Sequence, residues 1–346
     1  MKALVLERKL QLSIRDIDIP EQLGVDDVRI KITHVGICGS DLHYYLEGAL
    51  GFRIVKEPLV PGHEAAGVII EVGQNVKTLK VGDRVCMEPQ VPNLSSKASR
   101  RGLYHLDSSV RFWGAPPIHG CMRESVVHPA MFTFKLPDNV SLAEGAMMEP
   151  FAVGLFAATI AKIQPGDVAV VFGAGTIGLV TALAAKIGGC SKVIITDVLE
   201  ERLNFASKFG FIPVNITKEK LSDVVRNITD GWGADIIFEA SGNEAAISGI
   251  FETICPGGKI VLIGVPRQPV SINIYSGMVK GVHIETVFRY AHMFPKAITL
   301  VESGVVDLKP LITRTFPFEK AIEAFDYAAQ AKTNNVKTMI ELVKIQ

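Results

Sequence analysis

Residues 168–185 read VAVVFGAGTIGLVTALAA and carry no charged side chain. A β-branched and aromatic run over 168–172 leads into the glycine motif 173–178, GAGTIG, and helix-forming residues follow it. The spacing G-x-G-x-x-G is typical of a dinucleotide-binding turn when a strand precedes it and a helix follows it. The stretch is long enough to suggest a membrane span. Its three glycines instead favour a strand, a turn and a buried helix.

Each glycine of this motif has an expected role. Gly173 makes the tight turn, Gly175 lets the backbone approach a pyrophosphate, and Gly178 lets the helix pack closely on the strand. The start of the helix then offers N–H groups and the positive end of its dipole to the pyrophosphate. The sequence therefore predicts a nucleotide site at this turn.

An acidic residue, Asp197, follows the next predicted strand, KVIIT at 192–196. A carboxylate there suits the two ribose hydroxyls of NAD and repels the additional phosphate of NADP. Two unit charges about 4 Å apart repel by about 4 kcal/mol at an effective dielectric constant of about 20. Arg202 is a counter-signal, because an arginine nearby holds that phosphate, although it also reads as a solvated helix residue. The sequence favours NAD.

The chain divides by pattern into three stretches. Residues 1–150 show short apolar runs between Gly, Pro and Asp turns, whereas residues 151–288 alternate strand-like and helix-like runs. The second pattern predicts a doubly wound parallel sheet of α/β class. Residues 289–346 hold a helical pattern and a final short strand. The stretch 92–114 has no clear periodicity, which is typical of a functional loop or its remnant.

Composition limits the classes of partner. The 346 residues suggest about two domains, and the 36 basic and 36 acidic side chains balance, so nothing indicates a nucleic-acid or acidic-membrane partner. Five scattered cysteines without a C-x-x-C pair argue against a disulfide framework. Charges at 7–9 interrupt the apolar start, unlike a signal peptide. We expect a cytoplasmic protein.

Four polar side chains in three stretches are candidate metal ligands: Cys38, His63, Glu64 and Glu149. Thiolate, imidazole and carboxylate all suit zinc, and a catalytic zinc needs three protein ligands with one open position. Neighbours in a flat strand point to opposite faces, so the adjacent pair 63–64 ligates together only if the backbone bends. Gly62 permits such a bend. The alternative is an incidental polar pair in a turn, and spacing alone leaves both open.

Several motifs resemble the zinc-dependent medium-chain dehydrogenases, and within them the polyol branch of sorbitol and xylitol dehydrogenases. They include GICGSDLHYY at 36–45, VPGHEAAGVIIEVG at 60–73, KLPDNVSLAEGAMMEPFAVG at 135–154 and VFRY at 287–290. The resemblance runs nearly end to end. It implies a GroES-like β-rich catalytic domain, 1–150 completed by 289–346, and a Rossmann NAD-binding domain, 151–288.

The resemblance also assigns residues by position. It implies that Cys38, His63 and Glu64 ligate zinc, and that Glu149 either ligates directly or holds the zinc-bound water. It implies hydroxyl-binding residues at Tyr44, Arg289 and Tyr290, and a proton relay through Ser40 and His43, although His43 also reads as a surface histidine. The implied cofactor contacts are Gly173, Gly175, Ile177, Gly178, Asp197, Arg202, Ile263 and Val265.

The chain departs from many relatives in one lobe. Where they carry four cysteines around a structural zinc, residues 92–107 read PNLSSKASRRGLYHLD, with Asn93, Ser96, Ser99 and Asp107 at the aligned positions. Asparagine and serine supply no thiolate. We therefore expect one catalytic zinc and no structural zinc.

The implied activity is the reversible oxidation of a polyol to a ketose, with hydride passing to NAD and a homotetramer or homodimer as the assembly. Two rival interpretations remain open. One is another zinc alcohol or threonine dehydrogenase of the same superfamily, and the other is a non-catalytic NAD-binding protein. The sequence does not indicate which polyol is used or which carbon is oxidised.

Overall fold

The computed structural model describes residues 1–330 and 335–343. The chain divides into two compact units, which we call unit 1 and unit 2. Unit 1 comprises Met1–Glu149 and Phe294–Gln346, and unit 2 comprises Pro150–Met293. Helix α3 (Leu142–Ala161) begins in unit 1 and ends in unit 2. No helix among the described residues is long and apolar enough to cross a membrane.

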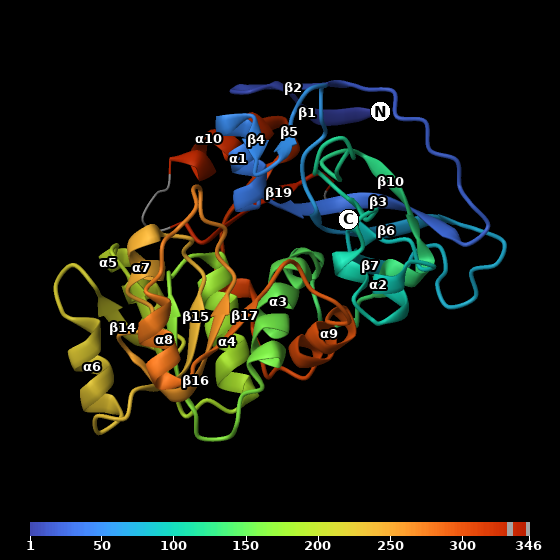
Figure 1. The fold of residues 1–346 in the computed structure, drawn as a ribbon. Helices are drawn as coiled ribbons and strands as arrows, with labels where there is room; N and C mark the ends of the chain where they lie inside the picture. The colour runs from blue at the N-terminus through green and yellow to red at the C-terminus, as the bar shows by residue number, and fades with distance from the viewer. Residues whose placement is uncertain (331–334, 344–346) are drawn as a thin grey trace. The chain divides into compact units, whose positions relative to one another are not determined.

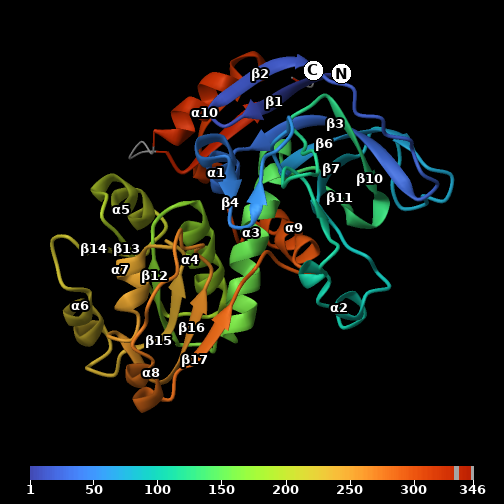
Figure 2. The same cartoon turned by 45° about the horizontal axis from the view of Figure 1, so that its top comes forward.

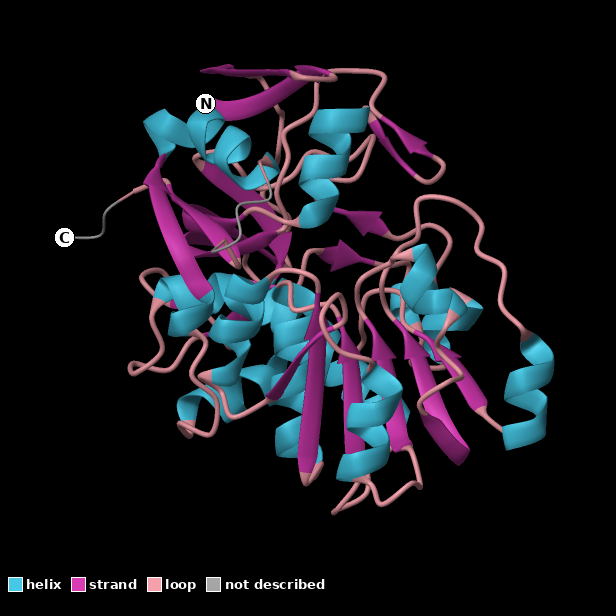
Figure 3. Cartoon of the chain, turned by 90° about the vertical axis from the view of Figure 1, so that its left-hand side faces the viewer, coloured by secondary structure: helices cyan, strands magenta, loops and turns pink. Residues whose placement is uncertain are grey.

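Unit 2 contains a six-stranded sheet in the order β14-β13-β12-β15-β16-β17, and every neighbouring pair is parallel. Helices lie on both faces of this sheet (Figures 1 and 3). The predicted doubly wound parallel sheet is thus confirmed. The strands are β12 (Val168–Phe172), β13 (Lys192–Asp197), β14 (Ile212–Asn215), β15 (Ala234–Glu239), β16 (Ile254–Leu262) and β17 (His283–Thr286). The helices are α4 (Thr176–Gly188), α5 (Glu200–Ser207), α6 (Leu221–Ile228), α7 (Glu244–Ser248) and α8 (Ile274–Lys280).

The strand order of unit 2 fixes where a ligand can bind. The strand order reverses at β12, because β13 and β14 follow on one side of it and β15, β16 and β17 on the other. In open α/β sheets, ligands bind beyond the carboxyl ends of the strands at such a switch point. One buried side chain from each of five adjacent strands anchors the core beneath it: Val170, Ile194, Val214, Ile237 and Ile260.

The glycine motif occupies this switch point, between β12 and α4. Gly173 has φ +94°, a conformation that side chains other than glycine rarely adopt. A Cβ on Gly178 would lie 1.8 Å from the Gly173 carbonyl oxygen, so the helix could not approach the turn with any larger residue. The strand, turn and helix predicted for 168–185 are therefore confirmed.

Unit 1 is built on a seven-stranded sheet in the order β11-β7-β6-β3-β19-β18, with β10 paired to β3 (Figures 1 and 2). Its strands are β3 (Asp27–Gly36), β6 (Glu64–Val72), β7 (Arg84–Met87), β10 (Ser125–Pro129), β11 (Thr133–Lys135), β18 (Ile312–Pro317) and β19 (Lys337–Glu341). Strand β19 brings the C-terminal segment beside β3, with Met339 opposite Gly36. Alternating apolar residues of these strands meet in one buried cluster that includes Ile30, Ile69, Val85 and Ile340.

Short elements complete unit 1. Three two-stranded sheets pair β1 (Lys2–Arg8) with β2 (Gln11–Asp16), β4 (Ala49–Leu50) with β5 (Arg53–Ile54), and β8 (Gln90–Val91) with β9 (Arg111–Phe112). The helices are α1 (Gly39–Glu47), α2 (Lys97–Arg100), α9 (Phe294–Glu302) and α10 (Ala321–Ala329). Single 3₁₀ turns cover Tyr104–Leu106, Ala130–Phe132, Lys309–Leu311 and Phe318–Lys320.

Hydrogen bonds connect the four positions where many relatives carry cysteines. The Asn93 N–H donates to Asp107 Oδ2 at 2.7 Å, and Ser96 Oγ lies 3.0 Å from Ser99 Oγ and accepts from the Ser99 N–H. Ser109 also donates to Asp107 through its N–H and its hydroxyl. Burial raises the pKa of Asp107, but these donors outweigh it and lower that pKa. The lobe is thus held through a buried carboxylate.

We predict that Asp107→Ala lowers the free energy of unfolding by about 1–3 kcal/mol, because several donors lose their acceptor. The lowered pKa means that the carboxylate stabilises the fold above its unfolded pKa of about 3.9 and stops doing so as pH falls through the folded pKa. The difference in the free energy of unfolding between wild type and Asp107→Ala should therefore be largest at pH 7 and shrink below about pH 4. Urea unfolding at several pH values measures it.

The matched control is Asp138→Ala, since the Asp138 side chain is fully exposed. A loss no larger for Asp107→Ala than for this control would contradict the role of the carboxylate in the lobe.

Candidate active site

Cys38 is placed by the start of helix α1. It is the N-cap residue, with extended φ and ψ of −89° and 155°. Its N–H donates to Asp41 Oδ2 at 3.0 Å, so the third helical residue caps the helix by reaching back to the first N–H group. This fixes the backbone from which the Cys38 thiol projects.

His63 and Glu64 are placed by a bend and a strand. Gly62 has φ +93°, and a Cβ there would lie 2.7 Å from Met122 Cγ, so only glycine fits. The bend precedes β6, which Glu64 opens. Both His63 and Glu64 are buried. The bend that the sequence analysis required of Gly62 is present.

The side chains of Cys38, His63 and Glu64 converge. Each offers one ligand atom, and these three atoms lie within 4.8 Å of one another. The donors are one sulfur, one imidazole nitrogen and one carboxylate oxygen, a combination that suits zinc. The residues present therefore fit a zinc ion with three protein ligands. Their role as ligands stays a prediction.

Asp41 supports this group, although the sequence analysis did not single it out. Its Oδ1 accepts from the Gly62 N–H at 3.0 Å and lies 3.8 Å from His63 Nδ1. The 3.8 Å separation is too long for a hydrogen bond, so Asp41 acts on the ring of His63 through its charge. The signal was local: Asp41 stands three residues after Cys38, the spacing of a capping box.

The electrostatics of the group favour a cation. Burial lowers the pKa of His63, but the negative charges of Cys38, Asp41 and Glu149 outweigh it and raise that pKa to about 10. A ring that attracts a proton so strongly lies among uncompensated negative charge. A divalent cation supplies the same compensation.

Lys337 is a positive group beside these acids, and no motif in the sequence pointed to it. Its Nζ lies 2.6 Å from both carboxylate oxygens of Glu64 and donates to the Ile37 carbonyl at 3.1 Å. Both side chains are buried. Burial lowers the pKa of Lys337, but the charges of Glu64, Cys38 and Glu149 outweigh it and raise that pKa. Because 273 residues separate the partners, no local pattern could reveal the pair.

Glu149 is buried in α3 and acts on the group by its charge, since it raises the pKa of both His63 and Lys337. Among the described residues, it does not belong to the trio whose ligand atoms lie within 4.8 Å. This geometry favours Glu64 over Glu149 as the third ligand. Whether Glu149 holds a metal-bound water stays a prediction.

Helix α1 carries three further predicted residues. Ser40 is half-buried, Tyr44 is buried, and His43 Nδ1 lies 3.3 Å from Glu47 Oε1 one turn later. Arg289 and Tyr290 belong to unit 2. Their functional roles stay predictions.

The predicted cofactor residues gather at the carboxyl edge of the sheet in unit 2. A Cβ added to Gly175 would meet no protein atom within 4 Å, so the turn leaves open the space that a pyrophosphate needs. Asp197 ends β13, and its Oδ2 accepts from the Ala174 N–H at 2.9 Å inside the glycine turn. The arrangement fits a dinucleotide. Ile177 lies in the first turn of α4, and Ile263 and Val265 follow β16.

Asp197 also contacts Arg202, whose Nη1 lies 3.6 Å from Asp197 Oδ2. The other carboxylate oxygen accepts from the N–H groups of Val198 and Leu199. The acid is therefore held rigidly at the end of the strand.

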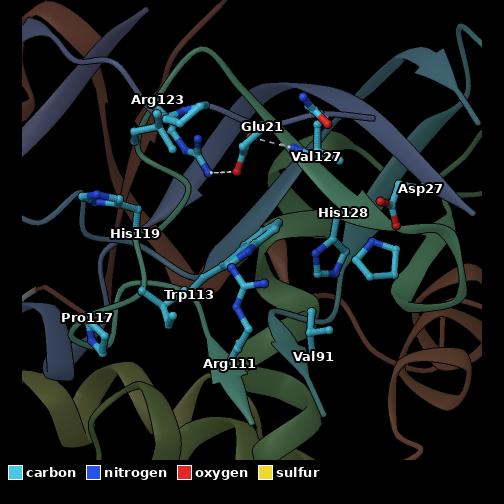
Figure 4. A pocket seen from close by; sticks show the side chains of 15 residues that line it. Glu21, Asp27, Val91, Arg111, Trp113, Pro117, His119, Arg123, Val127 and His128 are labelled. Atoms are coloured by element: carbon cyan, nitrogen blue, oxygen red, sulfur yellow. Dashed lines mark hydrogen bonds and ion pairs between the residues drawn. The ribbon is translucent and has the colours of Figure 1, made fainter. Parts of the chain in front are cut away.

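Unit 1 has a separate hollow of about 400 Å³ (Figure 4). Arg123 and Glu21 form an ion pair at its wall, with 2.7 Å between Nη2 and Oε1. Its described lining residues include Arg111, Trp113 and His119, and none of the predicted site residues.

Comparisons with known proteins identify the family of this chain. The family model for the alcohol dehydrogenase GroES-like domain matches residues 24–138, and the zinc-binding dehydrogenase model matches residues 176–303. The chain is 52% identical to a D-xylulose reductase of Morganella morganii, over 95% of this chain and 98% of that protein. It is 39% identical to the sorbitol dehydrogenase of Homo sapiens, over 94% and 91%. The crystal structure of 2R,3R-butanediol dehydrogenase from Bacillus subtilis matches with a TM-score of 0.91 and 30% identity, over 99% of each chain.

We predict that Cys38→Ser reduces bound zinc from about one ion per chain to near zero, because a serine hydroxyl does not replace a thiolate ligand. The far-ultraviolet circular dichroism should stay unchanged, since a catalytic metal is not required for the fold. Metal analysis of both proteins after dialysis measures the loss. Two tightly bound zinc ions per wild-type chain would contradict the interpretation of the lobe at 92–107.

Proposed function

The chain belongs to the polyol branch of the zinc-dependent medium-chain dehydrogenases, and we propose that it interconverts a polyol of the sorbitol or xylitol type and the corresponding ketose, using NAD. The observation that carries the proposal is the convergence of Cys38, His63 and Glu64 in one trio, with Cys38 half-buried and the other two buried. In this proposal, residues 1–150 with 289–346 form the catalytic domain and residues 151–288 the NAD-binding domain.

The chain's own residues would prepare the site for one zinc ion and one NAD. When bound, zinc supplies Lewis-acid stabilisation of a developing alkoxide and NAD accepts hydride. Cys38, His63 and Glu64 would hold the metal, and Asp41 would place a negative charge beside the imidazole of His63. Glu149 adds a carboxylate beside them that accepts hydrogen bonds from water or a substrate hydroxyl.

A polyol substrate is supported by the polar character of the predicted substrate residues. Tyr44, Arg289 and Tyr290 would bind hydroxyls beyond the reacting carbon. Arg289 adopts φ +61°, which costs about 1–2 kcal/mol for a residue other than glycine. Strain of this kind is found at functional sites, where the surrounding structure holds it.

The proton released on oxidation needs a path, for which we propose Ser40 and His43. His43 is partly exposed and faces Glu47, so a proton that reaches this ring can pass to solvent. Its hydrogen-bonded partner on the next helical turn keeps the ring in place.

NAD is favoured over NADP because Asp197 keeps a carboxylate at the end of β13. Arg202 contacts that carboxylate, so part of its charge is already engaged. The ribose hydroxyls of NAD would donate to Asp197, whereas the phosphate of NADP would meet it as a like charge.

A homodimer or homotetramer is supported by the open edge of the unit 2 sheet. All four residues of the edge strand β17 are exposed. Large apolar side chains are exposed on this strand and on the segments before and after it: Ile284 on β17, Tyr275, Met278 and Val279 on α8, and Phe288. A second copy can pair edge to edge about a twofold axis and cover these side chains.

A cytoplasmic location is supported by the cysteines. All five are free thiols. Free thiols are typical of proteins in a reducing compartment.

We predict a kcat/KM for NAD at least about tenfold higher than for NADP, because Asp197 repels the additional phosphate. Asp197→Asn removes the charge, although its amide NH2 then faces a backbone N–H from which the carboxylate accepts. It should narrow the NAD-to-NADP ratio of kcat/KM, because the like-charge repulsion of NADP is lost. Asp223→Asn, on an exposed helix of unit 2, is the control. Equal efficiency of the two cofactors with the wild type would reject the argument from Asp197.

We predict a strong preference for polyols, because an analogue without the additional hydroxyls forgoes the hydrogen bonds that the site would make to them, at about 0.5–1.5 kcal/mol per bond. The measurement is kcat/KM across sorbitol, xylitol, ribitol, threonine, ethanol and 2,3-butanediol. Arg289→Ala should lower polyol turnover far more than turnover of short alcohols, whereas the exposed Arg226→Ala should change neither. Ethanol or threonine matching the best polyol would favour the rival alcohol or threonine dehydrogenase. No turnover of any compound would favour the non-catalytic protein.

We predict that Val279→Asp reduces the molar mass in solution, because it places a charge on the apolar surface that a second copy would cover. Light scattering with size-exclusion chromatography measures the mass. Leu94→Asp, at an exposed leucine of unit 1, should leave the mass unchanged. A monomeric wild type would contradict the proposed assembly.

A further inference from the structure

The buried pair of Lys337 and Glu64 gives the metal trio a built-in counter-ion. We propose that Lys337 is a positioning residue that neutralises Glu64 when zinc is absent and weakens the hold of Glu64 on zinc when it is present. This inference rests on the zinc site of the proposed function and adds a determinant of its affinity.

Each N–H donor of the Lys337 ammonium has an acceptor within reach. It has three N–H donors, and the three acceptors within reach are both oxygens of Glu64 at 2.6 Å and the Ile37 carbonyl at 3.1 Å. Lys337 opens β19, which pairs with β3, and Ile37 directly follows β3. Strand pairing therefore fixes the backbone of Lys337 relative to the backbone of Ile37.

The Glu64 carboxylate packs against the backbone of β3. It lies opposite Gly36 in the pairing of β3 with β6. A Cβ on Gly36 would lie only 2.1 Å from Glu64 Oε2, so the carboxylate fills the space that a side chain would take. Removing the lysine would leave the carboxylate in place and without its charge partner.

The charges around Glu64 make such a partner necessary. Cys38, Asp41 and Glu149 are acidic groups of the same neighbourhood; among the described residues, His63 lies within it and Lys337 is a second basic group, in direct contact with Glu64. A buried carboxylate without a cation is strongly disfavoured. Lysine or a metal ion can meet this need, and a carboxylate has lone pairs for both. The two cations nevertheless repel each other and share one negative charge.

The ion pair of Arg123 and Glu21 provides a matched control within unit 1 (Figure 4). Arg123 is buried, and its Nη2 lies 2.7 Å from Glu21 Oε1. Glu21 lies outside the metal trio. Arg123→Met therefore removes a buried cation from a carboxylate outside the described metal trio.

The experiment compares Lys337→Met, Arg123→Met and wild type. Zinc affinity is measured by competition with a chromophoric chelator, and Tm is measured for zinc-free and zinc-loaded protein. Lys337→Met should lower the zinc-free Tm by several degrees more than the zinc-loaded Tm and tighten the zinc Kd about tenfold or more. Arg123→Met should lower both Tm values alike and leave the Kd unchanged.

A second background keeps the test decisive if zinc-free Lys337→Met does not fold. In Glu64→Gln there is no carboxylate to neutralise, so adding Lys337→Met should change the zinc-free Tm far less than it does in wild type. Equal effects in both backgrounds, or an unchanged or weaker zinc Kd for Lys337→Met, overturn the proposal. Wild type that binds no zinc overturns the zinc site itself, whereas wild type that binds zinc without a Lys337 effect rejects only this inference.

Discussion

The antiparallel pairing of β3 with β6 determines where the chemistry of this protein can occur. Gly36 faces Glu64 across the two strands, Cys38 follows the first strand two residues later, and His63 directly precedes the second. One register thus places thiol, imidazole and carboxylate together. Because a slip of one residue moves every side chain of a strand to the opposite face, the site depends on this register.

Such a site concentrates negative charge in a buried region. Unit 1 stabilises this charge with backbone N–H donors and a lysine. Backbone N–H groups of Cys38 and Gly62 donate to Asp41, and the ammonium of Lys337 contacts Glu64. The lobe at 92–107 uses the same means on a smaller scale, since N–H and hydroxyl donors converge on Asp107. Donors from the chain hold acids in place at both locations.

Prediction from sequence succeeded where the determining signal was local. The glycine motif after a β-branched run specified strand, turn and helix, and the alternating runs of 151–288 specified the parallel sheet. The sequence indicated that His63 and Glu64 could ligate together only with a bend at Gly62, but it did not show that the bend is present. The spacing of the residues along the chain did not decide whether the trio forms, because Cys38 and His63 approach each other only through strand pairing. Lys337 was out of reach for the same reason, whereas Asp41 was overlooked despite its capping-box spacing.

The family resemblance closed part of that gap, because its motifs carry positional information that spacing alone does not. The predicted family and fold class are confirmed, and the GroES-like domain model covers the region of the trio. The same resemblance gave no warning of Lys337, since no quoted motif includes it.

The place of β19 in the sheet has a consequence for synthesis on the ribosome. Residues 38, 63 and 64 emerge early, but the strand that delivers Lys337 to them is translated about 270 residues later, after all of unit 2. Until then, β3 has an unpaired edge where β19 will bind, and the acids of the trio lack their lysine. Since domains generally fold as units during translation, unit 2 can complete its sheet while unit 1 waits. Unit 1 would thus be the last part of the nascent chain to reach its native structure.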